Sequence, residues 1–162
     1  MFLWFVGTAI VAVWFVFRDP RFDYRLLVVG SVLPLLDALF GGARVMHTLV
    51  FSLALLVAVM LLTVNRLRAR RLWLGLAIGT LLHLVFDGAW TNTDVFWWPF
   101  GGWSFEDARL PEAARGWWNV PLELAGLAIL VWVWRTARLA DPARRRAVVR
   151  TGGLFDETSL SL

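Results

Sequence analysis

The most constraining feature of the sequence is one apolar run that carries two ionisable residues. Residues 72–90 are long enough to cross a bilayer as a helix, yet they contain His83 and Asp87, four positions apart. At the helical period these two residues share one stripe with Gly75 and Gly79. Glycines let a neighbouring helix approach closely, and ionisable side chains within a membrane span usually face the bundle interior and serve a function. The run therefore predicts a helix whose polar stripe meets the rest of the protein.

Four further apolar runs surround this one. Hydrophobic residues make up 59% of the 162 positions, a larger share than in an ordinary soluble domain. The sequence predicts an all-α fold, a polytopic membrane helix bundle with about five transmembrane helices within residues 1–140. Residues 91–118 are expected to form an outer aromatic loop, and residues 141–162 a cytoplasmic C-terminal tail that begins with a short helix and frays from residue 151. The five predicted helices are 2–17, 26–40, 45–64, 72–90 and 119–134.

The distribution of arginine predicts the orientation of these helices. All 16 basic residues are arginine; thirteen lie in the segments 18–25, 65–71 and 135–150, which five crossings place on one side. Such a bias puts those segments in the cytoplasm and the N-terminus outside. Short basic clusters between apolar runs are typical of membrane topology, so we expect no nucleic-acid partner despite the net charge of +4. The chain is expected in the bacterial cytoplasmic membrane, in contact with membrane lipid.

Both histidines and the acidic residues of the predicted spans fall at one depth, near the outer ends of their helices. The chain has no cysteine, so a metal ion here has only His, Asp and Glu side chains to bind it. Helix bundles build metal sites from side chains that several helices supply to a common centre. We therefore predict a divalent metal ion, with zinc as the first candidate, bound by His47, His83, Asp87 and Asp37. Catalytic roles are predicted for Glu123 and Asp87.

Each of these residues also has a structural interpretation when it is taken alone. A histidine and an aspartate four residues apart can form a hydrogen-bonded pair that rigidifies a bundle, and Glu123 suits the start of a helix because of the helix dipole. Asn119 is expected to cap that helix. The alternative function is thus a non-catalytic structural or adaptor protein, or a small transporter, whose polar cluster is interhelical packing. A transporter needs ionisable groups along a path, and the inner halves of the last three apolar runs carry none.

Tryptophan is concentrated in the predicted outer loop. The chain has 11 tryptophans, and this residue type is enriched at membrane–water interfaces. We expect the tryptophans of the loop to form an interfacial belt, or a cover over the polar site that admits lipid-like substrates. These residues are Trp97, Trp98, Trp103, Trp117 and Trp118.

Three segments resemble a known family over about residues 26–125. Pro34-Leu35-Leu36-Asp37, Met46-His47-Thr48 and His83-Leu84-Val85-Phe86-Asp87 are similar to motifs of the bacterial membrane-bound metal-dependent hydrolases of the LexA-regulated type. The chain departs from that pattern at Leu35 and Gly42, where the family has aspartate and histidine. The resemblance implies a membrane-embedded enzyme that hydrolyses a phosphodiester or ester bond in a lipid-like substrate at the extracytoplasmic face.

Overall fold

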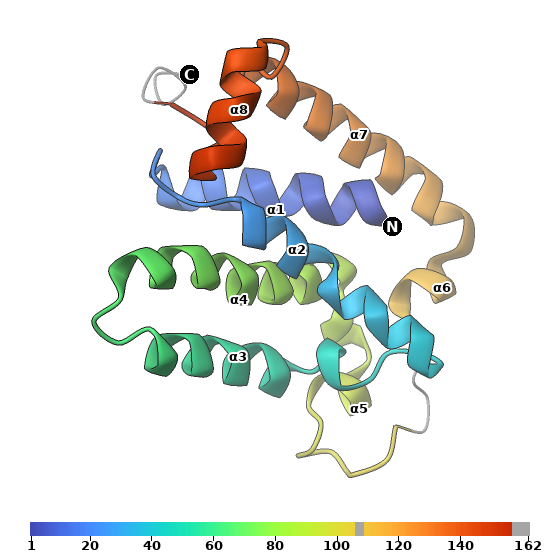
Figure 1. The fold of residues 1–162 in the computed structure, drawn as a ribbon. Helices are drawn as coiled ribbons and strands as arrows, with labels where there is room; N and C mark the ends of the chain where they lie inside the picture. Colours follow the sequence, from blue (N-terminus) through green and yellow to red (C-terminus); the bar gives the residue numbers. More distant parts are fainter. Residues whose placement is uncertain (106–108, 157–162) are drawn as a thin grey trace.

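The computed structural model describes residues 1–105 and 109–156, and every regular element within them is helical. The long helices are α1 (Phe2–Phe17), α3 (Leu49–Leu62), α4 (Leu67–Asp87) and α7 (Asn119–Thr136), with the shorter α2 (Arg25–Val32) between α1 and α4 (Figure 1). The predicted all-α fold is confirmed for the part of the chain that the structure describes.

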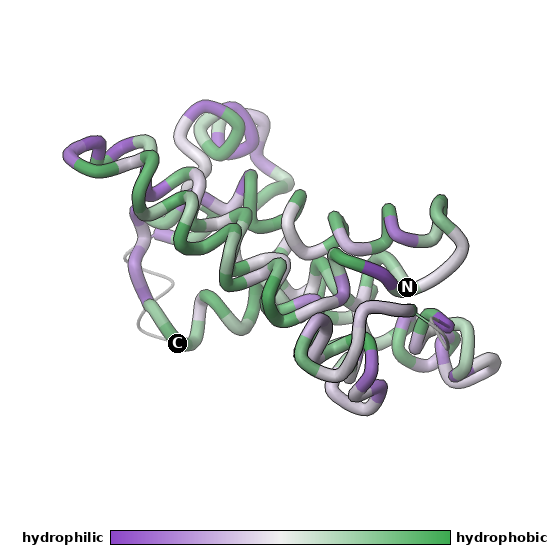
Figure 2. Tube along the Cα trace, turned by 90° about the horizontal axis from the view of Figure 1, so that it is seen from below, coloured by the Kyte–Doolittle hydropathy of each residue, from purple (hydrophilic) through white to green (hydrophobic). Residues whose placement is uncertain are grey.

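Two helical stretches are long and apolar enough to cross a membrane. They are Leu67–Asp87 and Ala113–Thr136, while α1 and α3 are apolar but shorter. Hydrophobic residues predominate along the long helices and hydrophilic residues gather toward their ends (Figure 2). Length and composition thus support a membrane protein, and the count of five spans stays a prediction.

The second apolar run is not the single helix that we predict for residues 26–40. Helix α2 passes into a 3₁₀ helix, η1 (Leu33–Phe40), which ends at Gly41 with φ of 89°. The cause is Pro34, which has no N–H to donate to the carbonyl group of Gly30, so an α-helix cannot continue regularly through it. A 3₁₀ winding has three residues per turn, and it changes the direction in which Asp37 points.

The third apolar run also begins differently from the prediction. A short 3₁₀ turn, η2 (Val45–His47), precedes α3, and Thr48 separates the two in an extended conformation. The Thr48 side chain accepts a hydrogen bond from the backbone N–H of Phe51 at 3.0 Å, which is the usual way that threonine caps a helix. His47 therefore lies on the connection before α3 and not within the helix.

Helix α4 begins and ends earlier than the predicted span of residues 72–90: it runs from Leu67 to Asp87, and Gly88, whose φ is 66°, follows its last residue. The connector that follows is not a plain loop, because its described residues contain four short helical elements. They are η3 (Ala89–Thr91), α5 (Thr93–Phe96), α6 (Pro111–Arg115) and η4 (Gly116–Trp118). Helix α7 has Trp118 at its N-cap position, so the predicted cap by Asn119 is wrong.

Glycines bring α2 and α4 into backbone contact, as the stripe on the organising helix predicts. A methyl group at Gly79 would lie 2.5 Å from the carbonyl oxygen of Leu27, and one at Gly30 would overlap the carbonyl oxygen of Leu76. Gly75 faces the backbone of α2 one turn earlier. The whole stripe is buried, which places its polar members in the interior of the bundle.

The end of the chain folds back on the bundle. Helix α8 (Pro142–Thr151) is followed by a segment in which Leu154 and Phe155 are buried, and the backbone N–H of Tyr24 donates to the carbonyl of Gly152 at 3.0 Å. The predicted short helix is confirmed. The predicted fraying is wrong for residues 152–156, because the two apolar side chains join the core; residues 157–162 lie outside the described part of the chain.

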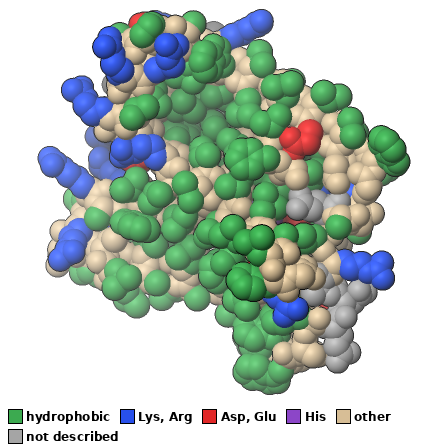
Figure 3. All heavy atoms as spheres, turned by 45° about the vertical axis from the view of Figure 1, so that its right-hand side comes forward, with side chains coloured by type: hydrophobic (Ala, Val, Ile, Leu, Met, Phe, Trp, Pro, Cys, Tyr) green, Lys and Arg blue, Asp and Glu red, His purple; other side chains and the backbone are tan. Residues whose placement is uncertain are grey.

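The three arginine-rich segments gather at one end of the molecule. A cavity of about 420 Å³ is lined by residues of the first two segments, including Arg21, Arg25 and Arg68, and by Thr151, which directly follows the third segment. The guanidinium group of Arg25 donates to the backbone carbonyl of Val149, within the third segment, at 3.2 Å. Most arginine side chains visible in Figure 3 lie toward this end, and hydrophobic side chains cover much of the remaining surface. The predicted grouping is confirmed, and the side of the membrane that this end faces stays a prediction.

Candidate metal centre

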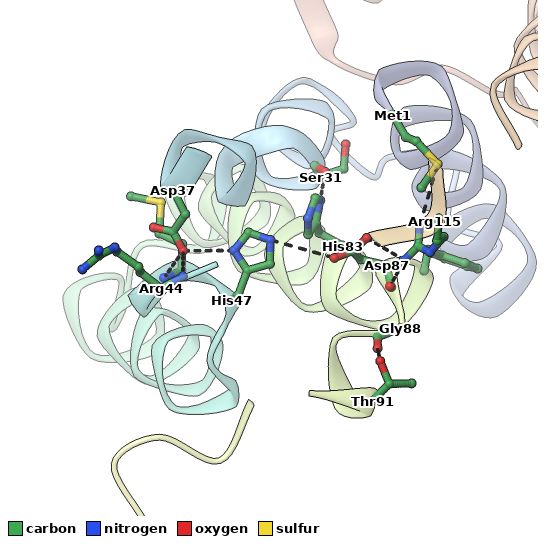
Figure 4. Close-up of polar contacts among 12 residues, drawn as sticks. Met1, Ser31, Asp37, Arg44, His47, His83, Asp87, Gly88, Thr91 and Arg115 are labelled. Atoms are coloured by element: carbon green, nitrogen blue, oxygen red, sulfur yellow. Dashed lines mark hydrogen bonds and ion pairs between the residues drawn. The ribbon is translucent and has the colours of Figure 1, made fainter. Parts of the chain in front are cut away.

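Three of the predicted ligands meet inside the bundle. His47, His83 and Asp87 each offer one ligand atom, and the three atoms lie within 4.8 Å of one another. Each of these residues is only 1% exposed. They come from the turn before α3 and from the last two turns of α4 (Figure 4). The predicted convergence is confirmed for these three residues, and their binding of a metal ion stays a prediction.

The backbone of α2 orients the ring of His83. The Nδ1 atom lies 2.8 Å from the carbonyl oxygen of Ser31, across the contact between α2 and α4. A carbonyl oxygen only accepts, so Nδ1 carries the hydrogen and Nε2 has the lone pair. That Nε2 atom is buried and has no hydrogen-bond partner. The ring of Phe5 packs against the imidazole, with the ring centroids 4.0 Å apart.

Asp37 orients the ring of His47 in the same manner. One carboxylate oxygen of Asp37 lies 3.0 Å from Nδ1 of His47, and it also accepts the backbone N–H groups of Arg44 and Met46 at 2.9 and 3.0 Å. The Nδ1 atom therefore donates, and Nε2 is again buried with no hydrogen-bond partner. It faces the Asp87 carboxylate, whose Oδ2 atom is 3.9 Å away.

Metal-bound histidines almost always donate their second ring N–H to a carboxylate or a backbone carbonyl. His47 and His83 both have such a partner on Nδ1, and in both rings Nε2 is buried without a hydrogen-bond partner. An orphaned buried nitrogen is costly, and two of them side by side fit a site that binds a cation. The residues present thus fit a metal ion, with Asp37 as the partner of one ligand and outside the group of ligand atoms.

Arg115 is the functional residue that sequence reasoning missed. Its Nη2 atom lies 2.8 Å from Oδ1 of Asp87 and also contacts the backbone carbonyl of that residue. In the sequence analysis, Arg115 enters only the count of arginines on each side of the membrane. The sequence does not reveal the conformation of the 91–118 connector, which brings Arg115 to Asp87. One signal was available: Arg115 is one of only three arginines on the predicted outer side.

The structure does not bring Glu123 into the cluster. Its Oε2 atom accepts the backbone N–H of Leu3 at 3.1 Å, and its Oε1 atom lies 3.9 Å from the amino group of Met1. The carboxylate thus serves the first turn of α1, whose N–H groups have no partner within the helix. A catalytic role for Glu123 stays a prediction.

The aromatic connector lies largely at the surface. Trp97, Trp103, Trp117 and Trp118 are 49 to 89% exposed, as expected for an interfacial belt. They do not line the cavity of about 430 Å³ beside Asp87, whose aromatic walls are Trp4, Phe86 and Trp90.

Over the described residues, the helical fold and its two long apolar stretches fit the class of helical membrane proteins. The chain belongs to the YdjM inner membrane protein family, whose family model matches residues 4–149. This membership indicates a bacterial inner membrane protein. Comparisons with curated proteins and with solved structures give no significant match.

Proposed function

We propose that this protein is a metal-dependent hydrolase of the bacterial inner membrane. One observation carries the proposal: His47 and His83 each have a buried Nε2 atom without a hydrogen-bond partner, and each offers a ligand atom within 4.8 Å of a carboxylate oxygen of Asp87. The two Nδ1 atoms are held by Asp37 and by the Ser31 carbonyl, so the rings cannot turn without losing those bonds.

The number of ligands favours catalysis over a structural role for the metal. Structural zinc sites have four protein ligands, whereas catalytic sites have three and keep a position for water or substrate. The group that the described residues form has three members: His47, His83 and Asp87. Zinc is the first candidate because two imidazoles and a carboxylate suit it and the chain has no thiol. The chemistry that such a cation supplies is Lewis acidity, which activates water and polarises a phosphoryl or acyl oxygen.

The surroundings support a lipid-like or phosphodiester substrate at the extracytoplasmic face. Asp87 lies at the end of α4, opposite to the arginine-rich end of the molecule, so the positive-inside rule assigns the centre to the outer side. The cavity beside Asp87 has mainly apolar walls, which suit an acyl chain or another hydrophobic group.

One contact favours the alternative, a non-catalytic role for the cluster. The guanidinium group of Arg115 pairs with Asp87, which gives the carboxylate a positive partner without any metal ion. In that case the cluster is interhelical polar packing that holds α4 to the connector. The two functions differ in one measurable property, which is the metal content of the protein.

The test is elemental analysis of the protein purified in detergent without added metal or chelator. The hydrolase hypothesis predicts about one equivalent of zinc or another divalent metal in the native protein. It also predicts that His83→Ala loses most of this metal. The matched control is Thr80→Val, because Thr80 is equally buried on the same helix and its side chain donates only to the carbonyl of Ala77. Native protein that binds no stoichiometric metal, even after zinc is added, would favour the packing role. A screen with phosphodiester and ester lipids then tests turnover.

A further inference from the structure

An open cavity of about 430 Å³ lies next to the candidate metal centre. It lies between the start of α1, the end of α4 and the connector. Asp87 lines it and also belongs to the cluster, since its Oδ2 atom faces His47 and its Oδ1 atom faces Arg115. The carboxylate is therefore the wall that the cavity and the metal centre share. The other walls include Trp4, Phe86, Trp90, Leu122 and Arg115.

The walls of this cavity combine apolar side chains with a cationic one. Most of the lining side chains are apolar or aromatic, and among the described residues that line the cavity the cation is Arg115. Its guanidinium group has five N–H donors, but its partners are the carbonyl and Oδ1 atoms of Asp87 and, weakly, the Met1 sulfur at 3.8 Å. The Arg115 side chain is 24% exposed and lines the cavity, so a ligand in the cavity lies within reach of this cation.

We propose that this cavity is the binding site of an amphiphile with a phosphate diester, and that Arg115 binds the phosphate. Guanidinium groups bind phosphate oxygens with two parallel hydrogen bonds, and the apolar walls accept the hydrophobic part of the ligand. The proposal rests on the proposed function in so far as the bound phosphate is the group that reacts. It names the substrate class, a phospholipid, and the residue that selects it.

The position of Arg115 determines where a bound phosphate would lie. The arginine pairs with Asp87 at 2.8 Å, so a phosphate that takes over part of its donor fork lies directly beside the carboxylate of the centre. A neutral lipid of the same length offers no oxyanion for the guanidinium group. Free phosphate lacks the chains that fill the aromatic part of the cavity. Both are therefore expected to bind more weakly than the phospholipid.

The experiment is isothermal titration calorimetry of the detergent-solubilised protein, after metal removal with a chelator. The probes are dioctanoyl phosphatidylglycerol, dioctanoylglycerol and inorganic phosphate. We expect the phospholipid to bind at least about tenfold more tightly than either of the others, which is the size of one charged hydrogen bond. Arg115→Ala is expected to weaken phospholipid binding at least about tenfold.

A second variant keeps the proposal testable if Arg115→Ala does not fold. Leu122→Trp fills the cavity and leaves the pair between Arg115 and Asp87 in place, and it should weaken phospholipid binding by a similar factor. Arg44→Ala is the matched control, because Arg44 lines a different cavity beside Asp37, and it should bind as the native protein does.

The proposal is overturned if folded Arg115→Ala binds the phospholipid with native affinity, or if dioctanoylglycerol binds as tightly as the phospholipid. If Arg115→Ala does not fold, native affinity in Leu122→Trp overturns the proposal. Inorganic phosphate that binds as well as the phospholipid would mean that the ligand is a free anion, and it would overturn the lipid assignment. Because binding is measured without metal, a native protein that shows this selectivity but neither metal nor turnover would refute the hydrolase and leave the binding site standing.

Discussion

Replacing Gly79 by alanine tests how the contact between α2 and α4 controls the candidate metal centre. The added methyl carbon would lie 2.5 Å from the carbonyl oxygen of Leu27, 2.7 Å from the backbone nitrogen of Ser31 and 2.8 Å from the carbonyl carbon of Gly30. All three are backbone atoms, so no side chain can move aside to relieve the overlap. Helix α2 has to move away from α4.

The size of the movement follows from these distances. Ordinary contact begins at 3.4 Å, so the carbonyl of Leu27 must retreat by about 0.9 Å. The carbonyl of Ser31 lies on the same helix, 2.8 Å from Nδ1 of His83, and an equal movement stretches that bond beyond the normal range of N–H···O hydrogen bonds. Overpacking of this kind costs about 1–3 kcal/mol of stability, and loss of the partner of a metal ligand costs about 10- to 100-fold in metal affinity.

The assay is twofold: thermal unfolding in detergent, and zinc affinity by competition with a chelator. Gly101→Ala is the matched control, because a methyl group there meets nothing within 4 Å. Gly75→Ala should fall between the two, since its closest backbone contact is 3.0 Å. Native unfolding temperature and native zinc affinity in Gly79→Ala would refute the reasoning. Lower stability with unchanged zinc affinity would separate the helix contact from the orientation of His83.

Three further predictions address other contacts. Asp37→Asn keeps the size of the side chain but weakens the acceptor for Nδ1 of His47, so zinc affinity should fall about 10- to 100-fold with little loss of stability; an unchanged affinity would count against the orienting role. Glu123→Gln should retain the metal content and lower the unfolding temperature, because it weakens the acceptor for the N–H of Leu3; loss of metal would instead place Glu123 in the centre. Phe155→Ala should destabilise the protein by about 3–5 kcal/mol, measured by thermal or denaturant unfolding, and a value near that of an exposed control such as Phe100→Ala would show that the chain end does not pack as described.

The helical period was sufficient to find the core of the site. Gly75, Gly79, His83 and Asp87 share one stripe in the sequence, and the structure buries that stripe against α2. The position of His47 at the start of the third apolar run, residues 45–64, was also predicted correctly. A histidine at the edge of an apolar run can be recognised without any knowledge of packing.

The position of Asp37 could not be predicted in detail. The sequence predicts a regular helix over residues 26–40, but Pro34 converts the winding to a 3₁₀ helix, and the Asp37 carboxylate turns toward the N–H groups of Arg44 and Met46. The direction of the Asp37 carboxylate depends on η1, on the turn at residues 41–44 and on η2. None of these segments has a hydrophobic period from which its conformation could be predicted.

Arg115 and Glu123 illustrate a second limit. Both act through partners far away along the chain: Arg115 through Asp87, and Glu123 through the start of α1. Charge counts and helix dipoles describe the surroundings of one segment, so they cannot show which distant backbone or carboxylate a long side chain will reach.

The return of the chain end has a practical consequence for mapping orientation. Phe155 lies among Trp14, Tyr24 and Trp132, with ring centroids 4.8, 5.7 and 6.3 Å away. Orientation is commonly mapped with reporter enzymes fused to truncated chains. Truncation within residues 141–156 would remove Phe155 and expose the rings that it covers, and the fusion protein would then be prone to proteolysis or misinsertion. A small epitope inserted at Gly101, where the surroundings are open, is expected to report the accessible face of the membrane without that disturbance.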